Sequence, residues 1–349
     1  FSSKGLKLDD AVELEIESWL DKDLEVVAPN LLGKAKRIDD AMGRYVECCK
    51  GTIPSSMSLD GLNIVLDCAH GATYQVAPYV FKELGANIET IGVEPNGLNI
   101  NKGVGSTSPQ SLVEKVLETG ADLGIAFDGD GDRLGVVDKD GNIVWADRQM
   151  MLYAEDILSR NPGSPIVFDV KCTQNLAKVI SAAGGQPMMG KTGHSFVKAK
   201  MIETDALLGG EMSGHIFFKE RWYGFDDGLY TAARLLEILS QDSRTPTEIF
   251  TALPDSVNTP EININFAEGE HYQFIEKFVA QAEFDDAEKV TIDGVRANFA
   301  DGWGLVRASN TTPCLVLRFE ADSQAAIERI QAQFREQIRS VDPTLDLPF

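Results

Sequence analysis

The sequence predicts an α/β protein of more than one domain, with a separate α+β module at its carboxyl end. Apolar strands alternate with helical segments as far as about residue 240, an order that is typical of layered α/β domains. After the proline-bearing stretch 254–260, several strands follow, and helices are expected only near 270 and at 323–339. With 349 residues, the chain is longer than one ordinary domain.

The expected elements come from apolar periodicity and from turn residues at the ends of each run. Strands are expected at 62–68, 88–92, 122–127, 166–170 and 206–208, and then at about 261–266, 288–299 and 303–319, where the polar stretch 307–313 lies between two strands. Helices are expected at about 9–20, from 71 to 84, and at 109–119, 147–159, 174–183 and 226–240.

Composition limits the classes of partner. Hydrophobic residues make up 43% and no apolar run approaches the about 20 residues that cross a bilayer, so we expect no membrane association. A formal net charge of -22 argues against nucleic acid, whose binding depends on basic surface. Five irregularly spaced cysteines indicate reduced thiols, and hence a cytoplasmic protein.

The stretch Asp128-Gly-Asp-Gly-Asp-Arg133 carries the strongest chemical signal. A solvated acidic turn is one interpretation. A calcium loop of the EF-hand type would need glycine and glutamate where Arg133 and Lys139 stand, so that pattern fails. Alternating carboxylates after an apolar strand instead favour a Mg²⁺ site that leaves coordination positions for phosphate oxygen.

Two further polar loops follow expected strands. The first, 209–215, is expected to be extended, so that Glu211, Ser213 and His215 project to one side and can accept sugar hydroxyls. The second, 307–313, offers a guanidinium, hydroxyls and an amide, which suit a phosphate. Taken alone, the first loop favours an ordinary glycine-rich turn, and the second fits a polar hairpin turn at least as well.

The three loops match, in the same order, the signature stretches of the α-D-phosphohexomutase family, which the chain resembles over nearly its whole length. The resemblance implies that Asp128, Asp130 and Asp132 bind Mg²⁺. The implied catalytic side chains are Arg133, His194 and His215. The implied substrate-binding side chains, which meet phosphorylated hexoses, are Lys171, His194, Glu211, Ser213, His215, Arg307, Ser309, Asn310 and Thr311. A structural role for either histidine stays open; in a catalytic role, either could assist proton transfer.

The resemblance also implies a multi-domain phosphohexomutase architecture. Mixed-sheet α/β domains are expected to precede an α+β domain like the TATA-binding protein. We expect a remnant of an N-terminal domain at 1–40, an α/β domain ending in the metal loop at 41–137, a second with the sugar loop at 138–253, and the phosphate-binding domain at 254–349.

The family reaction moves a phosphoryl group between the 1- and 6-positions of a hexose, through a phosphoserine and a hexose 1,6-bisphosphate. The Thr-x-Ser-His-Asn-Pro-like loop that carries this serine does not occur in the sequence. We therefore expect that the catalytic-serine domain is missing and that residues 1–349 alone are inactive as a mutase. A non-catalytic phosphosugar-binding fragment, or a partner for a separate N-terminal domain, is the alternative.

Two parts of the chain resemble different branches of the family. Residues 33–133 resemble bacterial phosphoglucosamine mutase, and residues from about 134 onward resemble bacterial phosphomannomutase/phosphoglucomutase. Because Glu211 and Arg307 lie in the second part, mannose and glucose phosphates are the expected substrates, with glucosamine phosphate as the alternative.

Overall fold

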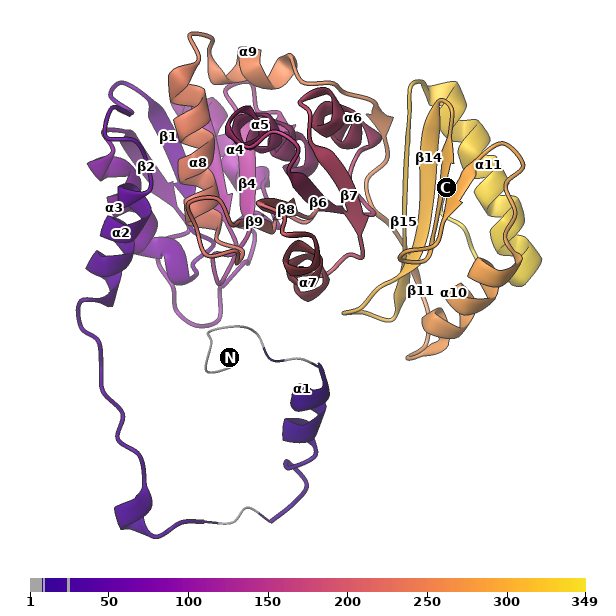
Figure 1. Ribbon diagram of the computed structural model, residues 1–349, viewed down its shortest axis with the longest axis horizontal. Coiled ribbons are helices and arrows are strands. Elements are labelled where there is room, and N and C mark those ends of the chain that lie inside the picture. The colour runs from indigo at the N-terminus through magenta and orange to yellow at the C-terminus, as the bar shows by residue number, and fades with distance from the viewer. Residues whose placement is uncertain (1–7, 9, 24–25) are drawn as a thin grey trace. The chain divides into compact units, whose positions relative to one another are not determined.

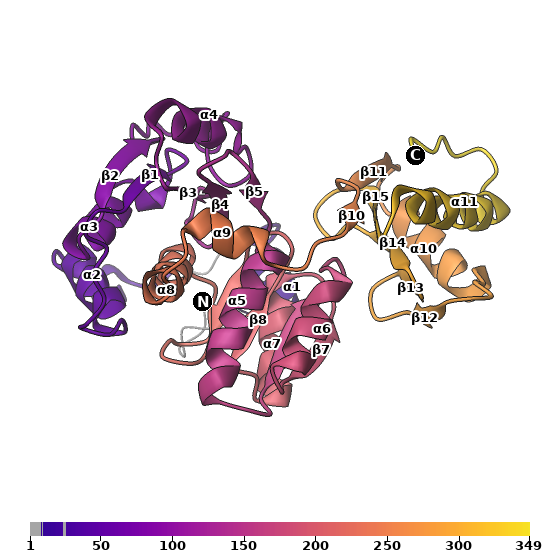
Figure 2. The ribbon, with the colours of Figure 1, turned by 90° about the horizontal axis from the view of Figure 1, so that it is seen from above.

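The structure is a computed structural model that describes residues 8, 10–23 and 26–349 (Figures 1 and 2). Its contacts divide the chain into two units, Phe1–Tyr45 and Val46–Phe349. The described part of the first unit holds α1 (Asp10–Glu17), the short 3-10 helix η1 (Pro29–Leu31) and the beginning of α2 (Ala41–Gly51). The expected helix at 9–20 thus ends at Glu17, and its first residue lies outside the described residues.

The second unit begins with a mixed sheet of strand order β2-β1-β3-β4-β5. Its strands are β1 (Asn63–Asp67), β2 (Asn87–Ile91), β3 (Leu123–Phe127), β4 (Leu134–Asp138) and β5 (Ile143–Val144). Its helices are η2 (Ala72–Tyr74), α3 (Val76–Glu83) and α4 (Gln110–Thr119). β1 runs parallel to β2 and β3, whereas β4 returns antiparallel to β3. The α4 side chains Leu112 and Val116 pack on Val65 and Val137, which explains why these strands are apolar.

A second mixed sheet follows, with strand order β7-β6-β8-β9. Its strands are β6 (Pro165–Asp169), β7 (Gln186–Gly190), β8 (Leu208–Gly210) and β9 (Ile216–Phe218). Its helices are α5 (Ala146–Arg160), α6 (Gln174–Ala182), α7 (His194–Thr204), α8 (Gly228–Gln241) and α9 (Pro246–Thr251). In Figure 1, α5 and α6 cover one face of the sheet and α7 covers the other.

The two sheets repeat one arrangement. In each, the first strand in the chain lies between two parallel neighbours, and the third is followed by an antiparallel return strand. The loop between β3 and β4 carries Asp128 to Arg133, and its counterpart between β8 and β9 carries Glu211 to His215. The metal and sugar loops therefore occupy equivalent places in two copies of one fold pattern.

The remaining residues form an antiparallel sheet of order β10-β15-β14-β13-β12, with β11 also paired to β15. Its strands are β10 (Val257–Asn258), β11 (Ile262–Asn265), β12 (Glu288–Val290), β13 (Val295–Phe299), β14 (Gly302–Ala308) and β15 (Cys314–Ala321). The helices α10 (Glu270–Gln281) and α11 (Gln324–Val341) lie on one face of this sheet (Figure 1) and close a core of phenylalanine, isoleucine and leucine side chains.

Several expectations need correction. No strand was expected at β4, β5, β7, β9 or β10 and no helix at α2, α7 or α9, because these segments have weak apolar periodicity or are very short. The stretch 288–299 forms two strands rather than one, since a turn with Gly294 at φ +71° divides it. The first sheet continues to Val144, beyond the expected boundary after residue 137, because β4 and β5 pair into it. The multi-domain α/β architecture with a final α+β module is confirmed.

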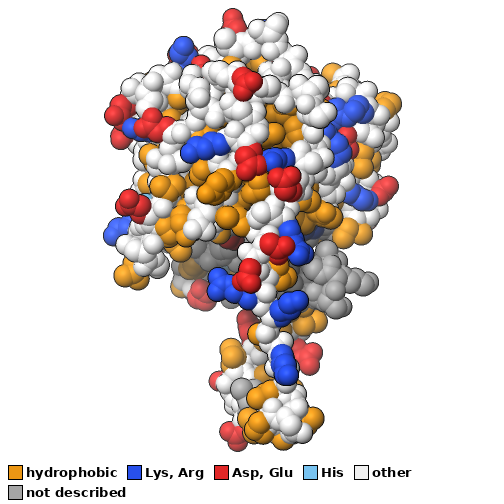
Figure 3. All heavy atoms as spheres, turned by 90° about the vertical axis from the view of Figure 1, so that its left-hand side faces the viewer, with side chains coloured by type: hydrophobic (Ala, Val, Ile, Leu, Met, Phe, Trp, Pro, Cys, Tyr) orange, Lys and Arg blue, Asp and Glu red, His pale blue; other side chains and the backbone are white. Residues whose placement is uncertain are grey.

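On the face drawn in Figure 3, the acidic and basic groups alternate over short distances. Among the described residues, no helix is both long and apolar enough to span a bilayer.

Candidate functional site

The turn between β3 and β4 brings three carboxylates together. Asp128, Asp130 and Asp132 each offer an oxygen, and these oxygens lie within 4.8 Å of one another. Asp128 is buried at 1% exposure, Asp132 is partly buried, and Asp130 is exposed. Arg133 fixes the buried member, because its backbone N–H donates to Asp128 Oδ1 at 3.2 Å and its Nε donates to Oδ2 at 2.5 Å.

Backbone contacts hold this loop in place. The Gly131 carbonyl accepts a hydrogen bond of 2.9 Å from the N–H of Gly228, the first residue of α8. The Gly129 carbonyl accepts another, of 2.8 Å, from the N–H of Ala72. Gly131 has a φ of +83°, which favours glycine. The loop geometry thus depends on segments that lie about 60 residues before it and 100 residues after it in the sequence.

The electrostatics of Asp132 fit a cation. Burial, together with the charges of Asp128, Asp130 and Asp226, raises its pKa to about 6 against the opposing effect of His215. Among the described residues, the buried Oδ1 of Asp132 makes no hydrogen bond, although His215 Nδ1 lies 3.4 Å from it. A hard divalent cation would satisfy a carboxylate oxygen of this kind, which has other carboxylates beside it, so these residues fit Mg²⁺.

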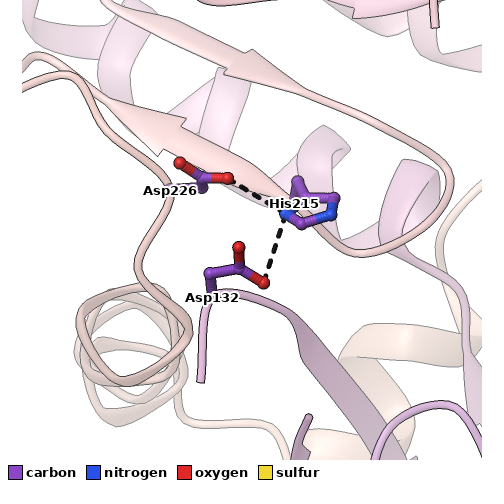
Figure 4. Close-up of side chains that lie close together, drawn as sticks. All are labelled: Asp132, His215 and Asp226. Carbon is purple, nitrogen blue, oxygen red and sulfur yellow. Dashed lines mark ion pairs between the residues drawn. The ribbon is translucent and has the colours of Figure 1, made fainter. Parts of the chain in front are cut away.

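His215 lies between two of these acidic groups (Figure 4). Its Nδ1 is 3.1 Å from Asp226 Oδ2 and 3.4 Å from Asp132 Oδ1. Burial by itself lowers the pKa of the imidazole, but the close pairing with Asp226 and the charges of Asp132 and Glu211 outweigh it, so the pKa is raised. Asp226 was not expected here, since its only local signal is its place at the start of the helix expected at 226–240.

The sugar loop is a tight turn, so the expected extended conformation is wrong. The Gly214 N–H donates to the Glu211 carbonyl at 3.1 Å, and the Glu211 N–H donates to the His215 carbonyl at 2.9 Å. Gly214 allows the turn because its φ is +103°. Glu211 and Ser213 nevertheless remain adjacent, since the serine Oγ donates to Glu211 Oε2 at 3.0 Å.

The metal and sugar loops are in direct contact. Arg133 and His215 form an antiparallel β-bridge, and the Leu134 N–H donates to the Gly214 carbonyl at 3.2 Å. Strand-like pairing therefore joins two loops that are separate motifs in the sequence.

Glu211 is 3% exposed. Burial, then the charge of Asp169, raises its pKa to about 7, while His215, Ser213 and Lys171 act in the opposite direction. Its Oε1 accepts a hydrogen bond of 3.0 Å from the Gly193 N–H, just before His194. The His194 and His215 rings lie with their centroids 5.8 Å apart.

Lys171 is almost fully buried, and its Nζ donates to Glu261 Oε1 at 2.7 Å. Burial lowers the pKa of this ammonium group, yet the charges of Asp169 and Glu261 reverse the direction, so its pKa is raised. Lys171 therefore remains a cation within the site.

The third loop joins β14 to β15. Arg307 is 4% exposed; its Nε donates to Asp293 Oδ2 at 2.8 Å, whereas its Nη2 is buried without a hydrogen-bond partner among the described residues. Ser309 Oγ accepts from the backbone N–H groups of Thr311 and Thr312, each at 3.3 Å. An ordered hydroxyl turn beside an unsatisfied guanidinium suits an oxyanion.

This third loop also reaches the second sheet. Asn310 Nδ2 donates to the Thr192 carbonyl at 3.3 Å, and the Thr192 N–H donates to Asp293 Oδ2 at 3.1 Å. The structure thus connects the metal loop to the sugar loop, and the phosphate loop to the segment beside His194. Asp293 is a further residue that no sequence motif identified.

Family models match most of the chain. The model described as phosphoglucomutase/phosphomannomutase α/β/α domain II matches residues 43–141, α/β/α domain III matches 145–257, and the C-terminal domain matches 261–337.

Curated relatives agree with these matches. A phosphomannomutase/phosphoglucomutase of Pseudomonas syringae is 53% identical over 311 residues, which are 88% of this chain and 66% of that protein. A phosphoglucosamine mutase of Marinobacter nauticus is 39% identical over 335 residues, 95% of this chain and 72% of that protein. The chain spans about two thirds of the length of the relatives it matches.

Solved structures share the fold. A phosphoglucomutase/phosphomannomutase family protein of Burkholderia thailandensis is 45% identical with a TM-score of 0.87, over 98% of this chain and 72% of that one. An N-acetylphosphoglucosamine mutase of Aspergillus fumigatus, solved with GlcNAc-6P and magnesium, has a TM-score of 0.65 over 89% of this chain and 68% of that one. At 15% identity, the second likeness shows the fold alone.

Proposed function

Because this chain belongs to the phosphoglucomutase/phosphomannomutase family of α-D-phosphohexomutases, we propose that it supplies the metal-, sugar- and phosphate-binding parts of an isomerase that interconverts hexose 1-phosphates and hexose 6-phosphates. The observation that carries the proposal is the contact between the metal loop and the sugar loop through Arg133 and His215. Phosphoryl transfer needs the charged phosphate and the accepting hydroxyl at one place.

Asp128, Asp130 and Asp132 would hold Mg²⁺, which would supply positive charge beside the transferring phosphoryl group. The Aspergillus enzyme, which shares the fold, was solved with magnesium, and this supports the assignment at the level of the fold. Arg133 orients Asp128, and its guanidinium adds positive charge at the same place.

Glu211 and Ser213 accept and donate hydrogen bonds at the sugar hydroxyls, and Lys171 and His194 complete the walls of this site. His215 moves a proton at the hydroxyl that receives the phosphoryl group; its contacts with Asp132 and Asp226 hold the ring in place for that role. His194 lies beside it and supports the same step.

Arg307, Ser309, Asn310 and Thr311 bind the phosphate that does not react. Arg307 carries this assignment, because its buried Nη2 has no partner among the described residues. One distal site of this kind serves both half-reactions if a hexose 1,6-bisphosphate turns around between them.

Mannose and glucose phosphates are the proposed substrates. Relatives that are 53% and 54% identical to this chain are named phosphomannomutase/phosphoglucomutase and phosphoglucomutase, respectively. Glucosamine phosphate is the alternative, favoured by the Marinobacter relative, whose match extends over 95% of the chain. Turnover of mannose 1-phosphate and glucosamine 6-phosphate, measured side by side on the protein joined to a serine-bearing N-terminal domain, tests the choice; dominant glucosamine activity would reverse it.

We further propose that residues 1–349 bind hexose phosphates but do not interconvert them, because the sequence contains no loop of the expected phosphoserine type. Calorimetry with glucose 6-phosphate should detect binding, and a coupled assay should detect no turnover until a serine-bearing N-terminal domain is added. Mutase activity at an ordinary enzymatic rate from residues 1–349 alone would contradict this.

A further inference from the structure

The carboxyl end of β6 carries a fully buried aspartate, Asp169, with 0% exposure. β6 lies between two parallel neighbours. Asp169 pairs in register with Gly190, the last residue of β7, and Phe168 pairs with Gly210, the last residue of β8. Because parallel strands end at the same edge of a sheet, the loops that follow β7 and β8 both begin beside this carboxylate.

Three donors converge on Asp169, and each comes from a different loop. Thr192 Oγ1, after β7, donates to Oδ2 at 2.9 Å. The Met212 N–H, after β8, donates to Oδ1 at 3.3 Å, and Cys172 Sγ, after β6 itself, donates to the same oxygen at 3.1 Å. A buried carboxylate is tolerated when donors of this kind replace its water.

We infer that Asp169 is a positioning residue for hexose recognition. By accepting hydrogen bonds from Thr192 and Met212 together, it sets the separation between the loop that presents His194 and the loop that presents Glu211 and Ser213. The inference rests on the proposed function, since it requires that these two loops bind the sugar.

A second link between the same loops supports the inference. The Gly193 N–H donates to Glu211 Oε1 at 3.0 Å, one residue after Thr192 and one residue before Met212. Asp169 therefore fixes the residues adjacent to this link on both sides. The charge of Asp169 also acts to raise the pKa of Glu211, as expected for two buried carboxylates in one site.

The first sheet contains a counterpart. Asp67 ends β1, is 0% exposed, and accepts hydrogen bonds from the N–H groups of Ala69 at 2.9 Å and Gly105 at 2.6 Å. In both mixed sheets, therefore, a buried aspartate ends the strand that lies between two parallel neighbours and joins the loops beside it. Of the two aspartates, only Asp169 joins loops that carry the proposed sugar ligands.

The test compares Asp169→Asn with the wild-type chain, using glucose 6-phosphate and inorganic phosphate as probes in calorimetry. Asparagine has one acceptor oxygen where aspartate has two, so it cannot accept hydrogen bonds from all three donors. Glucose 6-phosphate should therefore bind about tenfold more weakly or worse. Inorganic phosphate should lose clearly less affinity than glucose 6-phosphate does, because its proposed ligand Arg307 is held by Asp293 and the phosphate loop meets Asp169 only indirectly, through the contacts of Thr192 with Asp293 and Asn310.

The matched control is Asp138→Asn. Asp138 is also a buried carboxylate, at 3% exposure, that accepts three hydrogen bonds: two from the backbone at 140 and 142 and one from the Asn142 side chain. It is the last residue of β4, outside the proposed site. This variant should lose stability as Asp169→Asn does, yet keep its affinity for both probes.

A pair of variants at Thr192 separates positioning from folding and serves if Asp169→Asn does not fold. Thr192→Val removes the donor to Asp169 at nearly constant shape, whereas Thr192→Ser retains it. The valine variant should bind glucose 6-phosphate several-fold more weakly, and the serine variant should bind it as the wild type does.

The inference is overturned if Asp169→Asn and Thr192→Val bind glucose 6-phosphate within twofold of the wild type, or if Asp169→Asn loses glucose 6-phosphate and phosphate equally. Absence of glucose 6-phosphate binding by the wild-type chain is a different result, which rejects the proposed function itself.

Discussion

Two carboxyl groups of the proposed site are buried or partly buried, and burial disfavours their charged forms. Asp132 and Glu211 are carboxyl groups whose pKa values are raised to about 6 and about 7. Burial is the first cause for each, and neighbouring carboxylates add to it. A site that accumulates acidic groups in this way is poised to bind a cation or to accept hydrogen bonds from a ligand.

The state of Glu211 should appear in stability measurements. Its pKa is 4.5 in the reference state and about 7 in the folded protein, so the folded chain holds the proton more tightly. Its contribution to stability is therefore present below pH 4.5 and is lost as the pH rises through about 7. Between pH 5 and pH 8, the free energy of unfolding of Glu211→Gln should rise by about 2 kcal/mol relative to wild type.

Urea unfolding at both pH values measures this change. The exposed Glu203→Gln on α7 is the control, because it should leave the pH dependence of the wild type unaltered. An equal pH slope for Glu211→Gln and wild type would show that the buried carboxyl does not titrate in this range.

Removal of one acidic ligand tests the metal site. Asp130 is exposed, so Asp130→Asn should fold normally, yet Mg²⁺ affinity measured by calorimetry should fall by about tenfold or more, since one of three carboxylates is lost. Asp140→Asn, an exposed aspartate in the next turn, is the control. Unchanged Mg²⁺ affinity in Asp130→Asn would reject the three-carboxylate site.

At the scale of elements, helix α8 meets the metal loop through Gly228. A Cβ at this position would lie 2.7 Å from the Arg133 carbonyl oxygen and 2.8 Å from that of Gly131, and both are backbone atoms that cannot move cheaply. The helix can therefore begin this close to the loop only with glycine at its first residue.

Gly228→Ala should reduce stability by about 2 kcal/mol and weaken Mg²⁺ binding as well, since the clash displaces the loop. The matched substitution is Gly43→Ala in α2, where no atom lies within 4 Å of the added Cβ. That helical position should gain about 0.5–1 kcal/mol. Thermal unfolding with Mg²⁺ titration measures both effects, and equal behaviour of the two alanine variants would contradict the close approach of α8 to the loop.

At the scale of the whole second unit, buried arginines join the final sheet to the loop after β6. Arg296 is 1% exposed, donates from Nη1 to the carbonyls of Val170 and Cys172 at 2.6 and 2.8 Å, and stacks 3.7 Å from the Trp303 ring centroid. Arg318 donates to the carbonyl between them, that of Lys171. Burial lowers the pKa of Arg296 to about 10, so it stays charged at neutral pH.

Arg296→Met should therefore loosen the final module from the rest of the unit. Two carbonyl groups would lose their donor, at a cost of about 3 kcal/mol. Scanning calorimetry should then resolve a separate transition for residues 254–349, whereas Arg329→Met, an exposed arginine paired with Asp301 on the same module, should not. A single transition at the wild-type temperature in Arg296→Met would contradict this.

Much of the fold and part of the site followed from local signals. Strands β1, β3 and β6 and helices α4, α5 and α11 lie within a few residues of their expected positions, because the strands are unbroken apolar runs and the helices have a strong apolar period. Strands β4, β7 and β9 were not expected, because their apolar pattern is weak and their position is decided by pairing with a neighbouring strand. The proposed metal ligands Asp128, Asp130 and Asp132 could be proposed from the sequence because they alternate within one short stretch.

By itself, the sequence determined the family, the alternation of the elements and the chemistry of each loop, since those properties belong to neighbouring residues. Only the tertiary structure decided that Asp226 meets His215, that Asp293 holds Arg307 and that Asp169 joins two loops. These partners are 11 to 43 residues apart along the chain. Their proximity arises from the order of the strands in the sheets and from turns such as the one at Gly214. No local pattern of hydrophobicity encodes either feature.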